Sequence, residues 1–150
     1  MYETIYHRPS SVDEAAALFA KGSDSKYLAG GHTLIPVMKQ RLAAPSDVID
    51  LGKIADLIGV EVSADAVTIK AATTHYDVAG SGPVQKVIPA LAHLASLIGD
   101  PAVRYRGTIG GSIANNDPNA DYPAGALGLG ATIITNKRRI EADEFFKGLF

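Results

Sequence analysis

The pattern of apolar and polar positions predicts a small α/β unit at the start of the chain. Ser11 and Glu14 have the S-x-x-E spacing of a capping box, and the alanine-rich run that follows predicts a short helix ending at the next glycine. The run "KYLAG" predicts a strand, residues 33–41 a second helix, and residues 47–51 another strand. This order of helix, strand, helix and strand is typical of an α/β lobe.

The pattern changes after residue 59. The runs "GVEVS" and "AVTIKA" alternate between apolar and polar positions, and the Ala64-Asp65 pair between them predicts a hairpin. Residues 74–81 and 87–99 are predicted to be helical, the second with apolar residues at i, i+3 and i+4. A glycine-rich loop is expected next, followed by the strand "ATIIT", a turn, and a return strand that runs into a loop.

These two patterns predict an α+β chain with two lobes. A small α/β lobe is expected over residues 1–55, and an antiparallel-sheet lobe with helices over residues 56–150. Residues 52–59 are the candidate linker between the lobes. We find no internal repeat and no low-complexity tail in the sequence.

Composition narrows the possible partners and cofactors. The 14 Lys and Arg residues nearly balance the 16 Asp and Glu residues, and without a basic run we expect no nucleic-acid partner. No stretch approaches the ~20 consecutive apolar residues of a spanning helix, and the N-terminus lacks the pattern of a secretory signal, so we expect a cytoplasmic protein without a membrane-spanning segment. The absence of cysteine excludes thiolate zinc sites and cysteine-ligated iron–sulfur clusters from these 150 residues.

The first candidate site is the glycine pair in "YLAGGHT". Gly30 and Gly31 lie between a predicted strand and a predicted helix, so their amides and those of His32 and Thr33 can point at one place. Converging amides of this kind form an anion-binding cradle, and phosphate is the ligand that suits it best. A tight turn with nothing bound explains this segment equally well. The spacing matches neither the dinucleotide fingerprint G-x-G-x-x-G nor a P-loop.

The second candidate site is the segment "RGTIGGSIANNDPNAD". It interleaves glycines with hydroxyl side chains and ends in carboxylates: Gly107, Thr108, Gly110, Gly111, Ser112, Asp117 and Asp121. Glycine lets a diphosphate and a polyol approach the backbone, hydroxyls supply neutral hydrogen bonds, and a carboxylate accepts from sugar hydroxyls. Together the two segments favour a nucleotide cofactor, and they argue against an unrelated phosphate-binding transferase.

The stretches "YLAGGHTLIPVMKQRLAAPSDVIDLGKI" and "IGDPAVRYRGTIGGSIANNDPNADYPA" resemble the two flavin-binding signatures of one family. This family comprises the medium subunit of carbon monoxide dehydrogenase and the flavin domain of xanthine dehydrogenase, which are molybdenum hydroxylases. The resemblance runs from Tyr6 to Phe150. It implies the two-lobed FAD-binding fold of the vanillyl-alcohol oxidase type, truncated at the C-terminus, with FAD between the lobes.

The resemblance also implies which residues bind FAD. The first signature would hold the diphosphate and its neighbouring sugar through Ala29, Gly30, Gly31, His32 and Thr33. The second signature would form the second wall with Thr108, Ile109, Gly110, Gly111 and Ser112. A later carboxylate, Asp121, would bind a cofactor hydroxyl. These roles are binding roles, so we expect no catalytic residue. We also expect no metal ligand, because the four histidines lack metal-ligand spacing.

By the same resemblance, the chain is the flavoprotein subunit of a multi-subunit oxidoreductase and is not active alone. Its flavin would take electrons from the 2Fe–2S clusters of an iron–sulfur small subunit and pass them to an external acceptor. Those clusters would receive the electrons from the molybdenum cofactor of a molybdopterin large subunit. Relatives continue well past "EFFKGLF", so we expect FAD to bind weakly or not at all. The alternative is a truncated structural or interaction fragment of the fold that does not retain flavin.

Overall fold

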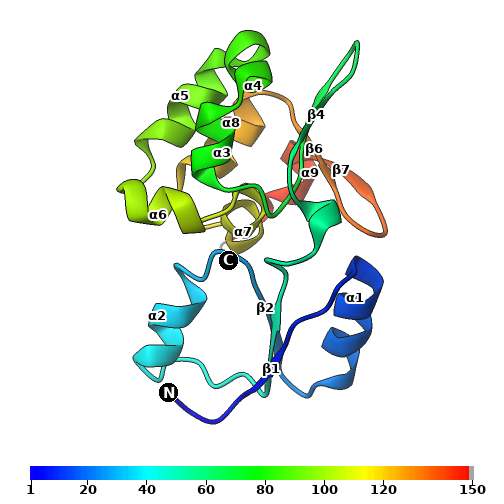
Figure 1. Cartoon of the computed structure of the whole chain (residues 1–150), viewed down its shortest axis with the longest axis vertical. Helices are drawn as coiled ribbons and strands as arrows, with labels where there is room; N and C mark the ends of the chain where they lie inside the picture. The colour runs from blue at the N-terminus through cyan, green and yellow to red at the C-terminus, as the bar shows by residue number, and fades with distance from the viewer. Residues whose placement is uncertain (149–150) are drawn as a thin grey trace.

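A parallel sheet of three strands forms the lower part of the molecule in Figure 1. The computed structural model describes residues 1–148, so the last two residues of the predicted second lobe lie outside the described residues. In the sheet, β3 (Asp47–Asp50) lies between β1 (Ile5–His7) and β2 (Ser25–Leu28). The connecting helices α1 (Val12–Lys21) and α2 (Leu34–Lys39) flank the sheet on opposite sides (Figure 1). The predicted α/β arrangement is therefore present in this part of the chain.

Helix α1 begins at the predicted capping box. The Ser11 Oγ accepts a hydrogen bond from the Glu14 amide at 3.2 Å, while the Glu14 carboxylate accepts from the amide and the hydroxyl of Ser10 at 2.8 and 2.9 Å. The buried face of the helix places Ala15 against Ile49 of the central strand, within one hydrophobic cluster. Capping fixes where the helix starts, and burial of its apolar face holds it on the sheet.

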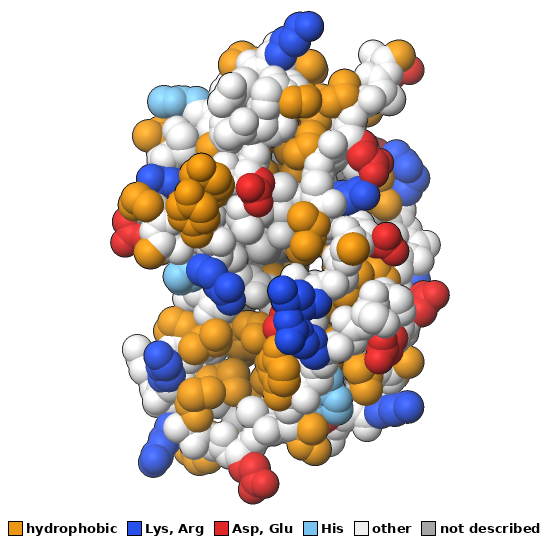
Figure 2. Space-filling model, viewed as in Figure 1, with side chains coloured by type: hydrophobic (Ala, Val, Ile, Leu, Met, Phe, Trp, Pro, Cys, Tyr) orange, Lys and Arg blue, Asp and Glu red, His pale blue; other side chains and the backbone are white. Residues whose placement is uncertain are grey.

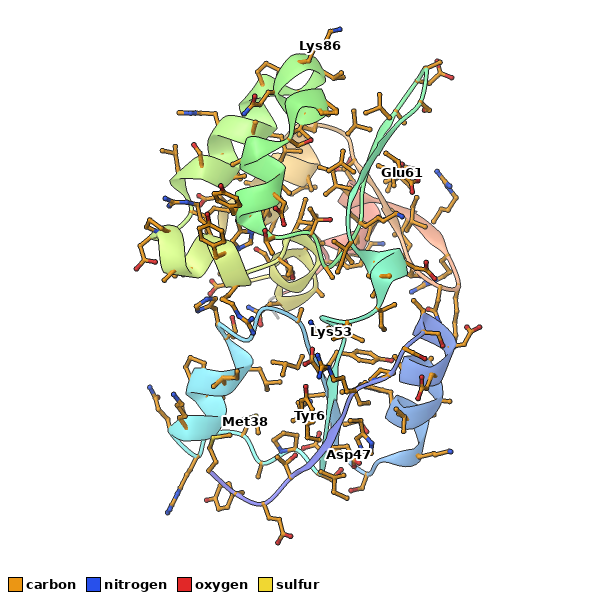
Figure 3. The ribbon with its side chains drawn as sticks, viewed as in Figure 1. Tyr6, Met38, Asp47, Lys53, Glu61 and Lys86 are labelled. Atoms are coloured by element: carbon orange, nitrogen blue, oxygen red, sulfur yellow. The ribbon has the colours of Figure 1, made fainter. Side chains whose placement is uncertain are left out.

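Strand β1 was not predicted from the sequence. It pairs with β3 in parallel, with Tyr6 opposite Val48, and side-chain bonds join the two strands. The Tyr6 hydroxyl donates to the Asp50 carboxylate, and His7 Nε2 lies 2.6 Å from Asp47 Oδ1; Figure 3 labels Tyr6 and Asp47. Because this edge strand leaves much of its surface exposed, it lacks the apolar alternation by which strands are predicted.

The segment expected to be a linker connects the lower and upper parts of the molecule and is anchored by one buried side chain. It contains the short 3₁₀ helix η1 (Ala55–Leu57), and the Ile54 side chain just before η1 is 0% exposed. Ile54 belongs to the same cluster as Ala15, and Leu57 packs against that cluster. Ile54 therefore anchors the connection on the lower cluster, whereas most of its other side chains are exposed.

The upper part of the molecule combines two separate hairpins with a set of helices (Figure 1). The antiparallel pairs are β4 (Val60–Val62) with β5 (Val67–Ile69), as predicted, and β6 (Thr132–Ile134) with β7 (Arg139–Glu141). The helices are α3 (His75–Gly80), α4 (Gly82–Val87), α5 (Pro89–Leu97), α6 (Pro101–Arg106), α7 (Ile109–Asn115), α8 (Asp121–Gly128) and α9 (Ala142–Phe145). This mixture of helices and short antiparallel pairs agrees with the predicted α+β class.

The helices bury one hydrophobic core against the first hairpin. Its buried members are Val78, Val84, Leu91, Ala92, Ala95, Ile109 and Tyr122. The side chains of Val60, Val67 and Ile69 pack against this cluster from β4 and β5. Among residues 1–148, no helix is both long and apolar enough to cross a membrane.

Three predictions of local structure in this part were wrong. The stretch expected as one helix over residues 87–99 is divided, because Ile88 leaves the helical region (φ −134°, ψ 66°) and Pro89 starts α5. The glycine-rich stretch expected as a loop contains the last two residues of α6 and all of α7 and α8, and the Thr108 side chain caps the start of α7. The return strand β7 runs into helix α9 and not into a loop.

Candidate functional site

A cavity of about 740 Å³ brings the two glycine segments together. It is lined by β2 and the residues after it, by the connection before α3, and by α7 and the residues after it. All predicted site residues except Ile109 and Asp121 belong to its lining: Ala29, Gly30, Gly31, His32, Thr33, Thr108, Gly110, Gly111 and Ser112. The two segments, separated in the sequence, thus share one crevice between the lower and upper parts of the molecule.

The first glycine segment lines this cavity and leaves several backbone amides without a partner. Gly31 has a φ of +79°, the left-handed region that glycine adopts without strain and other residues rarely enter. Among the described residues, nothing accepts a hydrogen bond from the amide nitrogens of Gly30, Gly31, His32 or Thr33. Unpaired amide donors without side chains in the way form a concave site for an anion.

Gly30 is also the point where the two lobes touch through their main chains. A Cβ on Gly30 would lie 2.6 Å from the Gly107 Cα, closer than any real side chain allows. The carbonyl of Gly107 in turn accepts a hydrogen bond from the His75 amide at 2.9 Å. Glycine at position 30 therefore allows the first segment to approach the start of the second.

The second glycine segment has a different backbone environment. Thr108 caps α7, and each of the next four amides donates within the chain: Ile109 to the Thr73 carbonyl at 3.1 Å, Gly110 to the Ala71 carbonyl at 2.9 Å, Gly111 to the Thr108 hydroxyl at 3.1 Å and Ser112 to the Thr108 carbonyl at 3.1 Å. These amides are not available to a ligand. The second segment can meet a ligand through its surface and hydroxyls, but it does not offer the bare amides expected from its glycines.

The side chains of the second motif divide between the cavity and the core. Thr108 is buried and Ser112 is partly exposed, and both line the cavity. Ile109 points into the upper hydrophobic core, and Asp121 is exposed at the first position of α8, outside the cavity lining. A cofactor contact of Ile109 or Asp121 therefore stays a prediction.

Among the polar residues of the cavity lining, His75 and Asn115 were not predicted as site residues, whereas Asp117 belongs to the second candidate segment. Asp117 forms a turn, because its Oδ1 accepts from the Asn119 amide at 2.9 Å. His75 follows the Thr74 cap of α3, whose hydroxyl accepts from the Asp77 amide at 3.1 Å. The capping pattern in "TTHYD" was a sequence signal for where this helix begins, but nothing in it indicated that His75 faces a cavity.

Burial sets the charge of His75. The loss of water around the ring, followed by the nearby His32 ring, lowers the pKa of His75 from 6.5 to about 4. The imidazole is therefore neutral at neutral pH. Within residues 1–148, no group of three or more His, Asp or Glu side chains could hold a metal ion.

The residues present fit the diphosphate of a nucleotide cofactor. Diphosphate oxygens need several donors, and the unpartnered amides from Gly30 to Thr33 supply them at the cavity wall. Gly111 faces the same segment, because a Cβ on it would lie 3.4 Å from the Ala29 Cβ. The fit thus comes from the backbone amides of the first segment and from the absence of a side chain at Gly111 in the second.

Comparison with known proteins gives the same assignment. Residues 1–150 match the family described as the FAD binding domain in molybdopterin dehydrogenase. The carbon monoxide dehydrogenase medium chain of Hydrogenophaga pseudoflava is 45% identical over 150 residues, which cover 97% of this chain and 52% of that protein. This chain therefore spans about half the length of the curated relatives it matches.

Solved structures agree in fold. The structure of the Hydrogenophaga pseudoflava carbon monoxide dehydrogenase that lacks the Mo-pyranopterin moiety matches with a TM-score of 0.94 at 45% identity, covering 98% of this chain and 53% of the other. Quinoline 2-oxidoreductase from Pseudomonas putida 86 matches with a TM-score of 0.93 at 32% identity and the same coverage. The resemblance and the FAD-domain fold predicted from the sequence are confirmed, and the chain belongs to the family of FAD binding domains in molybdopterin dehydrogenases.

Proposed function

We propose that this chain is the FAD-binding part of an electron-transfer subunit of a molybdenum hydroxylase. The observation that carries the proposal is the row of unpartnered amides at Gly30, Gly31, His32 and Thr33 on the wall of the shared cavity. Membership of the FAD-binding family identifies the type of anion that this cradle takes, a dinucleotide diphosphate. When bound, FAD supplies one-electron and two-electron transfer chemistry.

The chain's own residues bind and orient the cofactor. The amides from Gly30 to Thr33 donate to the diphosphate, and the Ser112 hydroxyl and the surface of Gly111 form the facing wall. The Thr108 hydroxyl already accepts from the Gly111 amide, which leaves its own proton free to donate. Asp121 is retained as a contact for a cofactor hydroxyl. None of these groups has a role in proton transfer.

The partners in this proposal carry the other redox centres. Two features support an iron–sulfur small subunit and a molybdopterin large subunit as partners: the absence of cysteine from the sequence, and relatives named as medium chains of carbon monoxide dehydrogenase. Electrons then enter from the iron–sulfur partner and leave to an external acceptor. The cytoplasmic location stays a prediction.

Titration of the purified chain with FAD tests the proposal. Flavin fluorescence should be quenched in a saturable way, and inorganic pyrophosphate should compete, because the diphosphate occupies the amide cradle. FAD binding that pyrophosphate leaves unchanged would contradict the role of the cradle. Absorbance of the freshly purified protein provides an independent readout, since bound flavin gives a visible spectrum.

The second candidate function is a structural or interaction fragment of the fold that does not hold flavin. The observation in its favour is that the chain covers 52% of the length of its relative from Hydrogenophaga pseudoflava. This alternative would be favoured if the protein is colourless and flavin fluorescence is not quenched at FAD concentrations up to about 1 mM. At that concentration, even a complex with a binding free energy of only about −4 kcal/mol is detected. The same protein should still fold cooperatively.

A further inference from the structure

The ring of His75 is a buried polar group on the cavity wall that has no assigned role. His75 is 5% exposed and belongs to the cavity lining at the start of α3. Its Nδ1 is buried and finds no hydrogen-bond partner among the described residues. Burying a nitrogen without a partner is unfavourable, and a hydrogen bond from a ligand that reaches the ring can offset this cost.

The surrounding backbone holds this ring in place. The His75 amide donates to the Gly107 carbonyl at 2.9 Å, and the neighbouring Thr74 forms a β-bridge with Thr108. The Tyr122 ring lies 5.3 Å from the imidazole, centroid to centroid. A Cβ on Gly107 would lie 2.7 Å from His75 Cδ2, so a side chain at position 107 would displace the ring. Helices α3 and α7 therefore begin side by side (Figure 1), and the imidazole packs against Gly107 just before α7.

The protonation state of the ring decides which ligand group it suits. Because burial lowers the pKa of His75 to about 4, the imidazole is uncharged at neutral pH, with one nitrogen as donor and the other as acceptor. Phosphate oxygens are bound best by cations or by several amides, and the amides of the first glycine segment already provide these. A neutral imidazole is suited to an uncharged oxygen.

We propose that His75 is a specificity-determining contact in this cavity, which hydrogen-bonds an uncharged hydroxyl or carbonyl oxygen of the flavin nucleotide and does not bind its diphosphate. This inference rests on the proposed function, because it takes FAD as the occupant. It divides recognition between the lobes, with the anion held by the first glycine segment and an uncharged part of the cofactor selected by the upper lobe.

The test compares binding of FAD and of inorganic pyrophosphate by the full chain and its variants. His75→Leu keeps a buried side chain of similar size but removes both nitrogens, so the Kd for FAD should rise about tenfold while the Kd for pyrophosphate stays unchanged. His75→Gln restores an uncharged donor and acceptor and should bind FAD within about threefold of wild type. His93→Leu is the matched control, since His93 is exposed on α5 and lies outside this cavity.

Each outcome decides the inference. Equal FAD affinity for wild type and His75→Leu would overturn this inference but not the proposed function. An equal rise of the Kd for FAD and of the Kd for pyrophosphate would have the same consequence. Failure of the wild-type chain to bind FAD would overturn the proposed function and this inference with it. If circular dichroism shows His75→Leu unfolded, ¹⁵N NMR of the wild-type ring replaces it: saturation with FAD should shift the His75 nitrogen signals more than those of His93, and unshifted His75 signals would overturn the proposal.

Discussion

The two glycine segments look alike in the sequence, as "AGGHT" and "TIGGS", but their backbones are used differently. The first leaves its amides unpartnered and places Gly31 at a φ of +79°. The second donates its amides to the upper lobe, and its glycine is needed for close packing, because a Cβ on Gly110 would lie 2.7 Å from the Ala71 Cα. A glycine pair can therefore serve a ligand or serve packing, and the pattern of hydrogen bonds distinguishes the two.

This difference separates the expected effects of substitution. Changes at Gly110 in the second segment should act mainly on the free energy of unfolding, since this glycine packs against the Ala71 backbone of the upper lobe. Changes at Gly31 in the first segment should also act on cofactor affinity, since this segment lines the cavity and its amides have no partner among the described residues. The lower and upper parts of the molecule, both drawn in space-filling form in Figure 2, can thus be tested separately, although both line one site.

The largest effect is expected for Gly110→Val. The new side chain would start 2.5 Å from the Ala71 Cβ and 2.6 Å from the Ala71 carbonyl oxygen, so α7 must move away from this segment. We expect a loss of about 3 kcal/mol or more in the free energy of unfolding, measured by urea denaturation. Gly128→Ala, whose added Cβ meets nothing within 4 Å, is the control and should change stability by less than about 1 kcal/mol.

The second effect concerns pH and His75, which packs against the start of the second segment. In the unfolded chain this histidine takes up a proton near pH 6.5, whereas in the folded protein burial lowers its pKa to about 4. Protons therefore favour unfolding as the pH falls from 6.5 toward 4, and the stability lost is about 3 kcal/mol. Urea denaturation across this pH range should show the loss in wild type, and His75→Gln should remove most of it; an identical pH dependence in both proteins would contradict the assignment.

For the first segment, Gly31→Ala should change binding as well as stability. Alanine at a φ of +79° costs about 1–2 kcal/mol of folding free energy, and its Cβ would lie 2.7 Å from Ile35 Cδ1. The Kd for FAD should rise about tenfold, equivalent to 1.4 kcal/mol, as measured by fluorescence titration.

Gly31→Asn is the control for backbone strain, because asparagine tolerates the left-handed region better than alanine. It should recover part of the stability while FAD binding stays weak. If FAD binding were normal in both variants, the first segment would not be the diphosphate cradle, and the comparison between the two segments would fail.

The smallest effect is expected for the cap of α7. Thr108→Val removes the hydroxyl that accepts from the Gly111 amide at 3.1 Å, and the loss of such a cap costs about 1 kcal/mol. Thr108→Ser keeps the hydroxyl and should remain close to wild type in thermal denaturation. A Val variant as stable as the Ser variant would show that the cap does not stabilise the second segment.

Local signals in the sequence predicted much of the fold. The capping box at Ser11 gave the start of α1, and alternating apolar positions gave the hairpin of β4 and β5. The prediction failed where distant contacts decide the structure. The helix α7 was expected as a loop because its glycines disfavour helices, but its first amides bond to Ala71 and Thr73, which no local pattern reveals.

The site was predicted from the family resemblance more than from the residues alone. Of the predicted site residues, all except Ile109 and Asp121 line the cavity. The motifs could not show, however, which backbone amides lack a partner. His75 was missed because its position follows from the bridge between Thr74 and Thr108, a contact between segments far apart in the sequence. Residues that reach a site through tertiary packing have no signature in a single sequence.

The buried Ile54 has a consequence for how a ligand enters. Ile54 anchors the connection on the lower hydrophobic cluster, and Gly30 meets Gly107 through the main chain, so contacts within the chain hold the two walls of the cavity together. Binding to such a preorganised cleft requires no domain closure, so little ordering entropy is lost on association. We therefore expect FAD to associate in a single kinetic phase whose observed rate rises linearly with FAD concentration.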